Sequence, residues 1–293
     1  MTRFFALRPV LRGLTIAAAV TAGGALPALS AGEGPGIAEH TFSFDGPFGT
    51  FDRAALQRGF QVYNEVCASC HSLSLLSYRN LGEPGGPEFS EAAVEAIAAE
   101  HQVPAGPDEF GDILDADGFL RMRPALPSDK FASPFQNEQA ARAANGGALP
   151  PDLSVITKAR HHGAHYLYSL MVGYPEESEK PACIGDTPGY YYNKYFAAGQ
   201  VPDSCKDEHG HATIQGSLIA MPPPLMPDRV TYADGTEASV AQMSSDVSTF
   251  LAWAAEPHME ARKRLGTQVM LYLAILTGFL YLSYRQVWSN VEH

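Results

Sequence analysis

Basic side chains are scarce in this sequence. Its 293 residues include 20 Lys and Arg against 32 Asp and Glu, which gives a formal net charge of -12. This deficit argues against nucleic-acid binding, because a phosphate backbone is recognised by basic surfaces, and it favours a basic partner attracted by long-range electrostatics. No internal repeat is visible, and the 45% hydrophobic content is enough for a sizeable core. We therefore expect a globular protein with an acidic surface.

Cysteine is also scarce, and the four cysteines fall into two separate pairs. Cys67 and Cys70 belong to the run Cys67-Ala68-Ser69-Cys70-His71, whereas Cys183 and Cys205 lie far along the chain and 22 positions apart. A zinc site would need a second Cys or His pair at close spacing, so this distribution argues against zinc. A thioredoxin-like redox pair is the other alternative, but that chemistry does not require a histidine after the second cysteine.

The C-x-x-C-H pattern of Cys67, Cys70 and His71 is typical of covalent haem attachment. Side chains at positions i and i+3 share one helical face, so both sulfur atoms can reach one porphyrin edge. The imidazole that follows can then bind the iron. The sequence therefore predicts one haem c per chain, attached through Cys67 and Cys70, with His71 as an axial ligand.

A methionine is the expected second axial ligand. Met221 precedes Pro222-Pro223-Pro224, which stiffen the backbone before folding. A thioether ligand raises the reduction potential, which suits an electron carrier. Met226, followed by Pro227, is the alternative. Because Met221 lies 150 positions after His71, the middle of the chain must be inserted between the two ligand-bearing segments.

The N-terminal segment has the pattern of a secretory signal peptide. Residues 1–12 are basic, Gly13 to Val20 are apolar, and Ala28-Leu29-Ser30 offers small residues at the -3 and -1 positions of a cleavage site. A retained anchor fits less well because the apolar run is short and broken by Gly23, Gly24 and Pro27. Without an Arg-Arg pair, we expect export of the unfolded chain and haem attachment outside. Removal of residues 1–30 would leave a net charge of -15. The oxidising compartment would allow a Cys183–Cys205 disulfide, with two free thiols as the alternative.

The C-terminal segment lacks charge over 20 positions, from Leu265 to Tyr284, which is long enough for a transmembrane helix. Arg262, Lys263 and Arg264 precede this helix and only Arg285 follows closely. The positive-inside rule alone would therefore place the large domain in the cytoplasm. The export signal and the haem chemistry outweigh it. We expect a periplasmic domain over 31–262, a transmembrane helix over 265–284 and a cytoplasmic tail over 285–293, with a single pass through the inner membrane.

The local patterns predict a mainly α fold. Asp52 should begin a helix that leads into Cys67. The apolar face of this helix is expected to carry Leu56, Phe60, Tyr63 and Val66. Gly59 should allow close approach of a helix that begins at Ser244-Ser245-Asp246. Further helices are expected over 91–100, 153–160 with a cap at Asp152, and 164–172. The acidic stretch 108–117 does not match a calcium-binding loop, so we expect a solvated surface. His161 and His162 are adjacent, do not share a helix face and are expected on the surface. Arg160 is a candidate for binding a haem propionate, because a carboxylate favours a planar bidentate cation.

Four segments together resemble cytochrome c1, the haem subunit of ubiquinol:cytochrome c oxidoreductase, of the alphaproteobacterial type. These are Arg58 to Tyr63 leading into Cys67 to His71, the run Ala141 to Ser154, the Met221-Pro222 strap, and Trp253-Ala254-Ala255-Glu256-Pro257 before the membrane segment. The resemblance implies a cytochrome c-like haem domain with long irregular insertions plus one C-terminal transmembrane helix.

The resemblance also implies roles for individual residues and partners. It favours Met221 over Met226 as the ligand, and it places Asn145, Pro151, Arg160 and Tyr166 around the haem, with Arg160 near a propionate. A cysteine pair like Cys183 and Cys205 occurs in some bacterial members. The implied function is electron transfer from a Rieske iron-sulfur protein to a soluble or membrane-anchored cytochrome c. The chain would be a non-catalytic subunit beside cytochrome b in a dimeric complex.

Three other functions remain open at this stage. A haem peroxidase would keep the sixth iron position exchangeable, and a membrane-tethered thiol oxidoreductase would need Cys67 and Cys70 free to cycle. A membrane-anchored cytochrome c that serves an oxidase would share the electron-carrier chemistry but would not associate with a quinol-oxidising cytochrome b.

Overall fold

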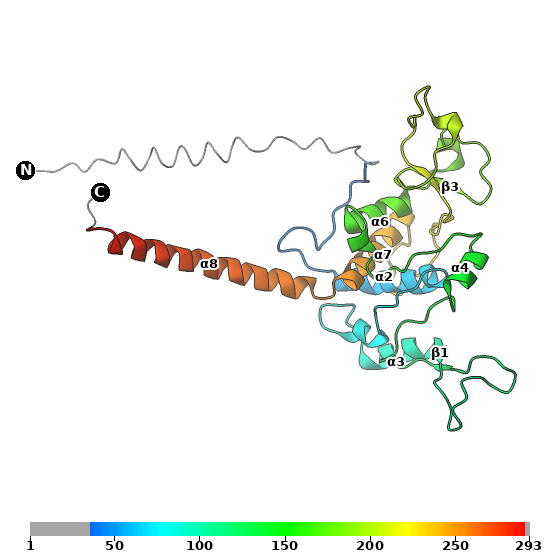
Figure 1. Cartoon of the computed structure of the whole chain (residues 1–293), viewed down its shortest axis with the longest axis horizontal. Coiled ribbons are helices and arrows are strands. Elements are labelled where there is room, and N and C mark those ends of the chain that lie inside the picture. Colours follow the sequence, from blue (N-terminus) through cyan, green and yellow to red (C-terminus); the bar gives the residue numbers. More distant parts are fainter. Residues whose placement is uncertain (1–35, 291–293) are drawn as a thin grey trace, which may run out of the picture. The chain divides into compact units, whose positions relative to one another are not determined.

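The computed structural model describes residues 36–290, which are mainly helical with long irregular connections (Figure 1). The predicted signal peptide 1–30 and the last three residues of the predicted tail lie outside the described residues. The helices are α2 (Arg53–Glu65), α3 (Glu91–Ala99), α4 (Glu138–Ala144), α5 (Ile156–Ala159), α6 (Gly163–Val172), α7 (Val240–Ala255) and α8 (Met259–Val287). The strands are β1 (Gln102–Pro104), β2 (Met122–Pro124), β3 (Tyr191–Asn193) and β4 (Ser217–Ile219). Short 3-10 helices are η1 (Cys67–Ser69), η2 (Tyr78–Gly82), η3 (Glu177–Glu179) and η4 (Asp203–Cys205).

Helix α2 begins where the sequence predicts. The Asp52 carboxylate accepts hydrogen bonds from the backbone N–H groups of Ala54, at 2.9 Å, and Ala55, at 3.4 Å, which satisfies two donors that the first turn leaves unpaired. Its apolar face, with Leu56, Phe60 and Tyr63, is buried in the main core. The predicted cap and the predicted apolar face are confirmed.

Helix α7 crosses α2 at Gly59, as expected. A Cβ atom on residue 59 would lie 2.0 Å from the Asp246 carbonyl oxygen and 2.8 Å from Phe250 Cβ, so only glycine fits. Beside this crossing Arg58 forms two hydrogen bonds to the buried Asp246 carboxylate, at 2.9 and 3.0 Å. The predicted start of α7 is wrong, because the helix begins at Val240 after a Ser239 cap. Ser244 lies inside it and donates to the Val240 carbonyl.

The remaining helix predictions have mixed outcomes. The helices expected over 91–100 and 164–172 correspond to α3 and α6, and both His161 and His162 are exposed. The helix expected over 153–160 is wrong in length. Only Ile156–Ala159 is helical, and Asp152 is used elsewhere than as its cap.

The irregular insertions are held by short strands and one disulfide. Antiparallel β1 and β2 lie at the base of the acidic stretch 108–117, whose Asp108 and Asp115 carboxylates accept backbone N–H groups of their own turns. Antiparallel β3 and β4 belong to a second insertion with its own small core of Ile184, Tyr192 and Cys205. The expected Cys183–Cys205 disulfide is formed within this insertion.

Helix α8 is the one helix in the described part of the chain that is long and apolar enough to cross a membrane, and none of its apolar segment is buried. Its 29 residues begin at Met259, before the charge-free span. The first turn belongs to the folded domain: Met259 is buried, and Glu260 pairs with Arg53 of α2 through hydrogen bonds of 2.9 and 2.8 Å. The expected C-terminal transmembrane helix is confirmed, and it extends without a break from the core of the domain.

Candidate haem site

The attachment motif continues directly from α2. Residues Cys67–Ser69 form the single 3-10 turn η1, and the backbone N–H groups of Cys70 and His71 both donate to the Cys67 carbonyl, at 3.1 and 2.9 Å. Cys67 and Cys70 are both half-buried thiols that are not bonded to each other. Two unlinked thiols one turn apart, followed by an imidazole, are the donor set that covalent haem attachment requires.

The His71 ring is oriented by a single hydrogen bond. Its Nδ1 lies 2.8 Å from the Pro151 carbonyl oxygen, which can only accept, so Nδ1 carries the hydrogen and Nε2 keeps a lone pair. Burial lowers the pKa of His71 and the hydrogen bond to Pro151 opposes this, with a net shift downward. A neutral imidazole held by a backbone carbonyl through its other nitrogen is the usual arrangement of a histidine that binds a metal. This geometry fits a haem iron at Nε2.

Asp152 fixes the segment that carries the Pro151 carbonyl. Its carboxylate accepts from the Ser72 hydroxyl at 2.8 Å and from the backbone N–H groups of Ser74, at 2.9 Å, and Ser154, at 2.8 Å. Burial alone would raise the pKa of Asp152, but the hydrogen bonds from Ser154 and Ser74 outweigh it and lower that pKa to about 2. Residues 151–154 are therefore bound to the chain just after His71.

The strap that carries Met221 is held at two points. The Tyr174 hydroxyl donates to the Met221 carbonyl at 3.0 Å, and Leu225 is buried in the main core. Met221 is half-buried, whereas the Met226 side chain is 55% exposed. The strap therefore keeps the Met221 side chain partly inside the fold and leaves the Met226 side chain in solvent. Tyr174 is a residue that sequence reasoning missed, because it lies 47 positions from its partner.

The four other expected pocket residues have different surroundings. Pro151 contributes its carbonyl to His71. Tyr166 packs against the same core as Cys67; its pKa is raised by burial, an effect that the nearby Arg160 guanidinium partly offsets. Arg160 is exposed and donates to the Ala159 carbonyl. Asn145 is directed back to its own helix, where its side-chain amide donates to Ala141.

The sequence is similar to known proteins over most of its length. Residues 42–291 match the model of the Cytochrome C1 family. Cytochrome c1 of Rhodospirillum rubrum is 42% identical, and cytochrome c1 of Cereibacter sphaeroides is 43% identical, each over 97% of this chain and 98% of the relative. A protein of Bradyrhizobium diazoefficiens named cytochrome b/c1 is 48% identical over 85% of this chain, which spans 35% of that relative.

These similarities cover the haem motif, the Met221 strap and the membrane helix together. The two cytochromes c1 are matched over almost their full length. The chain therefore belongs to the cytochrome c1 family, the single-pass membrane subunits that carry covalently attached haem c and transfer electrons within the bc1 complex.

Proposed function

We propose that this chain passes single electrons from a Rieske iron-sulfur protein to cytochrome c. In this proposal Cys67 and Cys70 hold the haem, His71 and Met221 are its axial ligands, and Arg160 is close to a propionate. The haem supplies a one-electron couple when bound. The observation that carries the proposal is the hydrogen bond from His71 Nδ1 to the Pro151 carbonyl, because it leaves the Nε2 lone pair available to bind a metal.

The protein's own contribution is to hold the two ligand segments in place. Asp152 anchors the Pro151 carbonyl, and Tyr174 anchors the Met221 carbonyl. A thioether on an anchored strap stays bonded in both oxidation states, which keeps small molecules such as oxygen from the iron. The residues therefore favour an electron carrier over a haem peroxidase, which needs an exchangeable sixth position.

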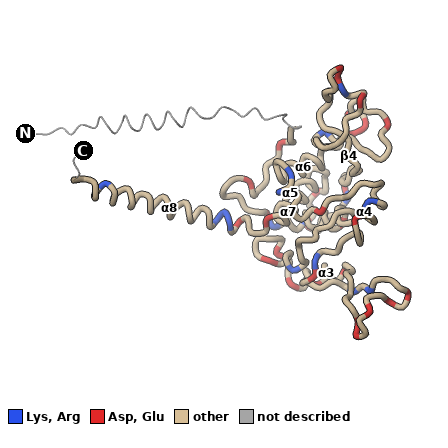
Figure 2. Tube along the Cα trace, in the orientation of Figure 1, with Lys and Arg blue, Asp and Glu red and all other residues tan. Residues whose placement is uncertain are grey.

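The expected partners follow from the family and from the surface charge. The Bradyrhizobium protein is named cytochrome b/c1, which supports cytochrome b as a neighbour of this chain. Figure 2 shows acidic residues along the outlying loops of the domain, and the formal net charge is -12. Such a surface favours a basic acceptor, which we propose to be a soluble or membrane-anchored cytochrome c. Assembly of the complex as a dimer belongs to the same proposal.

We also propose that the haem domain, residues 31–262, lies on the periplasmic side and that the tail 285–293 is cytoplasmic. By the positive-inside rule alone, the three cations before the membrane span oppose this orientation. Two of them are bound to the folded domain: Arg262 pairs with Glu256, and Lys263 donates to the carbonyls of Phe44, at 2.6 Å, and Gly49, at 3.0 Å. The signal-peptide pattern of residues 1–30 and the haem attachment chemistry support an exported domain despite these cations.

The function is tested by a Met221→Leu variant, with Met226→Leu as the matched control. Reduced-minus-oxidised spectra of the membrane-bound chain are recorded with and without carbon monoxide. The parent and Met226→Leu should show a c-type band that carbon monoxide does not change, whereas Met221→Leu should bind the gas and lose reduction potential. Carbon monoxide binding by the parent would favour a peroxidase-type haem, and the absence of haem would favour a thiol oxidoreductase.

A further inference from the structure

The loop of residues 44–50 presents one aromatic side chain to the outside. Segment 42–51 contains four phenylalanines, of which Phe42 and Phe51 are 4% and 5% exposed and Phe44 packs against the same core. Phe48, in contrast, is 77% exposed. A large apolar side chain that is fixed outside the core of a folded domain often marks a contact with another apolar phase.

The loop has a defined conformation. The Phe42 N–H donates to the Asp45 carboxylate at 2.7 Å, and the Thr50 N–H donates to the Ser43 carbonyl at 3.2 Å. Lys263 of α8 donates to the carbonyls of Phe44 and Gly49, on the two sides of the tip. The exposure of Phe48 is therefore a property of a loop that is bound to the membrane helix.

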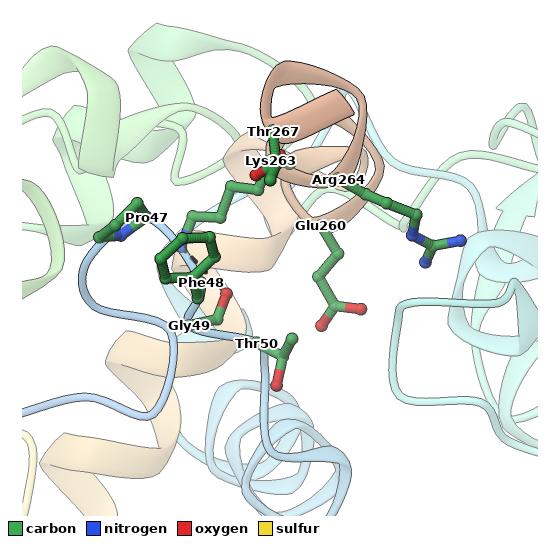
Figure 3. Close-up of a pocket in the computed structure, with 8 residues that line it drawn as sticks. All are labelled: Pro47, Phe48, Gly49, Thr50, Glu260, Lys263, Arg264 and Thr267. Atoms are coloured by element: carbon green, nitrogen blue, oxygen red, sulfur yellow. Dashed lines mark hydrogen bonds between the residues drawn. The ribbon is translucent and has the colours of Figure 1, made fainter. Parts of the chain in front are cut away.

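The position of the loop along α8 indicates what covers it. Pro47, Phe48, Gly49 and Thr50 line a shallow cavity of about 150 Å³ together with Glu260, Lys263, Arg264 and Thr267 of α8 (Figure 3). Thr267 is the third residue of the charge-free span that begins at Leu265. A loop that faces this turn lies at the edge of the hydrocarbon layer, on whichever side of the membrane the domain is found.

The charges at the same level are suited to a phospholipid headgroup. Glu260 in the cavity is already paired with Arg53, and Arg262 and Lys263 have partners inside the domain. Arg264 is exposed and makes no ion pair within residues 36–290. Figure 3 shows Phe48 on one side of Glu260 and Arg264 on the other. An aromatic ring and an unpaired guanidinium at the start of a membrane span complement an acyl chain and a phosphate.

We infer that loop 44–50 is a second membrane contact of this chain, in which Phe48 inserts into the interfacial region of the bilayer and Arg264 binds a phospholipid phosphate. The inference needs only the membrane helix and does not depend on the axial ligands or the electron partners. Loop and helix together would hold the base of the domain against the lipid surface.

The first test measures the depth of residue 48. In the haem-loaded full chain Cys67 and Cys70 are bonded to haem and Cys183 and Cys205 to each other, so Phe48→Cys introduces the only free thiol. A spin label on this thiol is studied in vesicles of phosphatidylcholine and phosphatidylglycerol, with oxygen as the lipid-soluble and a nickel chelate as the water-soluble relaxant. Phe110→Cys is the matched control, because Phe110 is 82% exposed and belongs to the acidic loop. A native haem band confirms that each variant is folded.

We expect oxygen to accelerate the relaxation of the label at position 48 more than the nickel chelate does. The nickel chelate should have the larger effect on the label at position 110. Equal nickel accessibility at the two positions would overturn the inference. The inference would also be overturned if the label at position 48 remained accessible to the nickel chelate in vesicles of the chain alone and became immobile only when cytochrome b was present. That result would assign the loop to a protein interface.

The second test concerns the phosphate contact. Native mass spectrometry of the chain released from nanodiscs of the same lipids measures the fraction that retains phosphatidylglycerol. Arg264→Gln should retain about fivefold less, because one basic residue near an anionic surface contributes an effect of this size. Arg262→Gln, whose parent residue is paired with Glu256, should retain as much as the parent chain. Equal retention by both variants would remove Arg264 from the proposal.

Discussion

Replacement of Gly59 by alanine tests the helix crossing on which the haem domain is built. Alanine favours helix over glycine by about 1 kcal/mol, so on propensity alone Gly59→Ala would stabilise α2. In the structure the added Cβ would lie 2.0 Å from the Asp246 carbonyl oxygen, although ordinary contact begins near 3.4 Å. The two helices would have to separate by about 1.4 Å, the difference between these distances. Helix propensity and the close crossing therefore predict opposite signs for the change in stability of this variant.

The cost of this separation exceeds the gain in propensity. Overpacking of a well-packed core costs about 1–3 kcal/mol, and the shift would also lengthen the two hydrogen bonds from Arg58 to Asp246. With a clash of about 3 kcal/mol and a gain of about 1 kcal/mol, the net loss is about 2 kcal/mol, which lowers the melting temperature of a domain of this size by about 4–8 °C.

The assay is thermal unfolding of the haem-loaded full chain in detergent, followed by the haem band and by circular dichroism. Gly266→Ala is the matched control, because Gly266 is also helical but has nothing within 4 Å of an added Cβ. The control should melt at or above the parent temperature. A Gly59→Ala chain that melts at or above the parent temperature would refute the close crossing of α2 and α7.

Two further predictions concern regions away from this crossing. Removal of the disulfide in a Cys183→Ser, Cys205→Ser chain should free a 22-residue loop and cost about 3 kcal/mol within that insertion. Hydrogen exchange in residues 183–219 should therefore accelerate about 100-fold, and unchanged exchange would show that the small core holds the insertion without the bridge. Arg123 lowers the pKa of Asp129 to about 2, below its value in the unfolded chain, so the stabilisation is complete above about pH 4 and is lost as the pH falls towards 2. Between about pH 5 and about pH 3, the melting temperature of the Asp129→Asn chain should fall less than that of the parent chain. Parallel curves of melting temperature against pH for the two chains would contradict this role of Asp129.

Sequence reasoning succeeded where the interactions are local. The Asp52 cap, the apolar face of α2 and the C-x-x-C-H turn each depend on residues within a few positions of one another. The start of α7 was missed because Ser239 and Ser244 are both plausible caps. Only the fold shows that the Ser244 hydroxyl bonds back to Val240 inside the helix.

The supports of the haem site could not be predicted in this way. Asp152 reaches Ser72 and Ser74 across about 80 positions, and Tyr174 reaches Met221 across 47. Such pairs depend on how the long insertions fold back, which periodicity and capping signals do not specify. Asp152 was therefore interpreted as a helix cap, although its carboxylate joins two distant loops.

Helix α2 links the membrane to the haem motif at a fixed distance and a fixed angle. Arg53 at its first residue is paired with Glu260 of α8, and its last residue, Glu65, is followed within two positions by Cys67. Thirteen residues at about 1.5 Å each make a spacer of about 20 Å, and each residue turns the chain by about 100°. One residue inserted into α2 would therefore move the attachment turn along the helix axis by only about 1.5 Å, but it would rotate the turn about that axis by about 100°. The direction in which the haem edge faces would change far more than its height above the lipid.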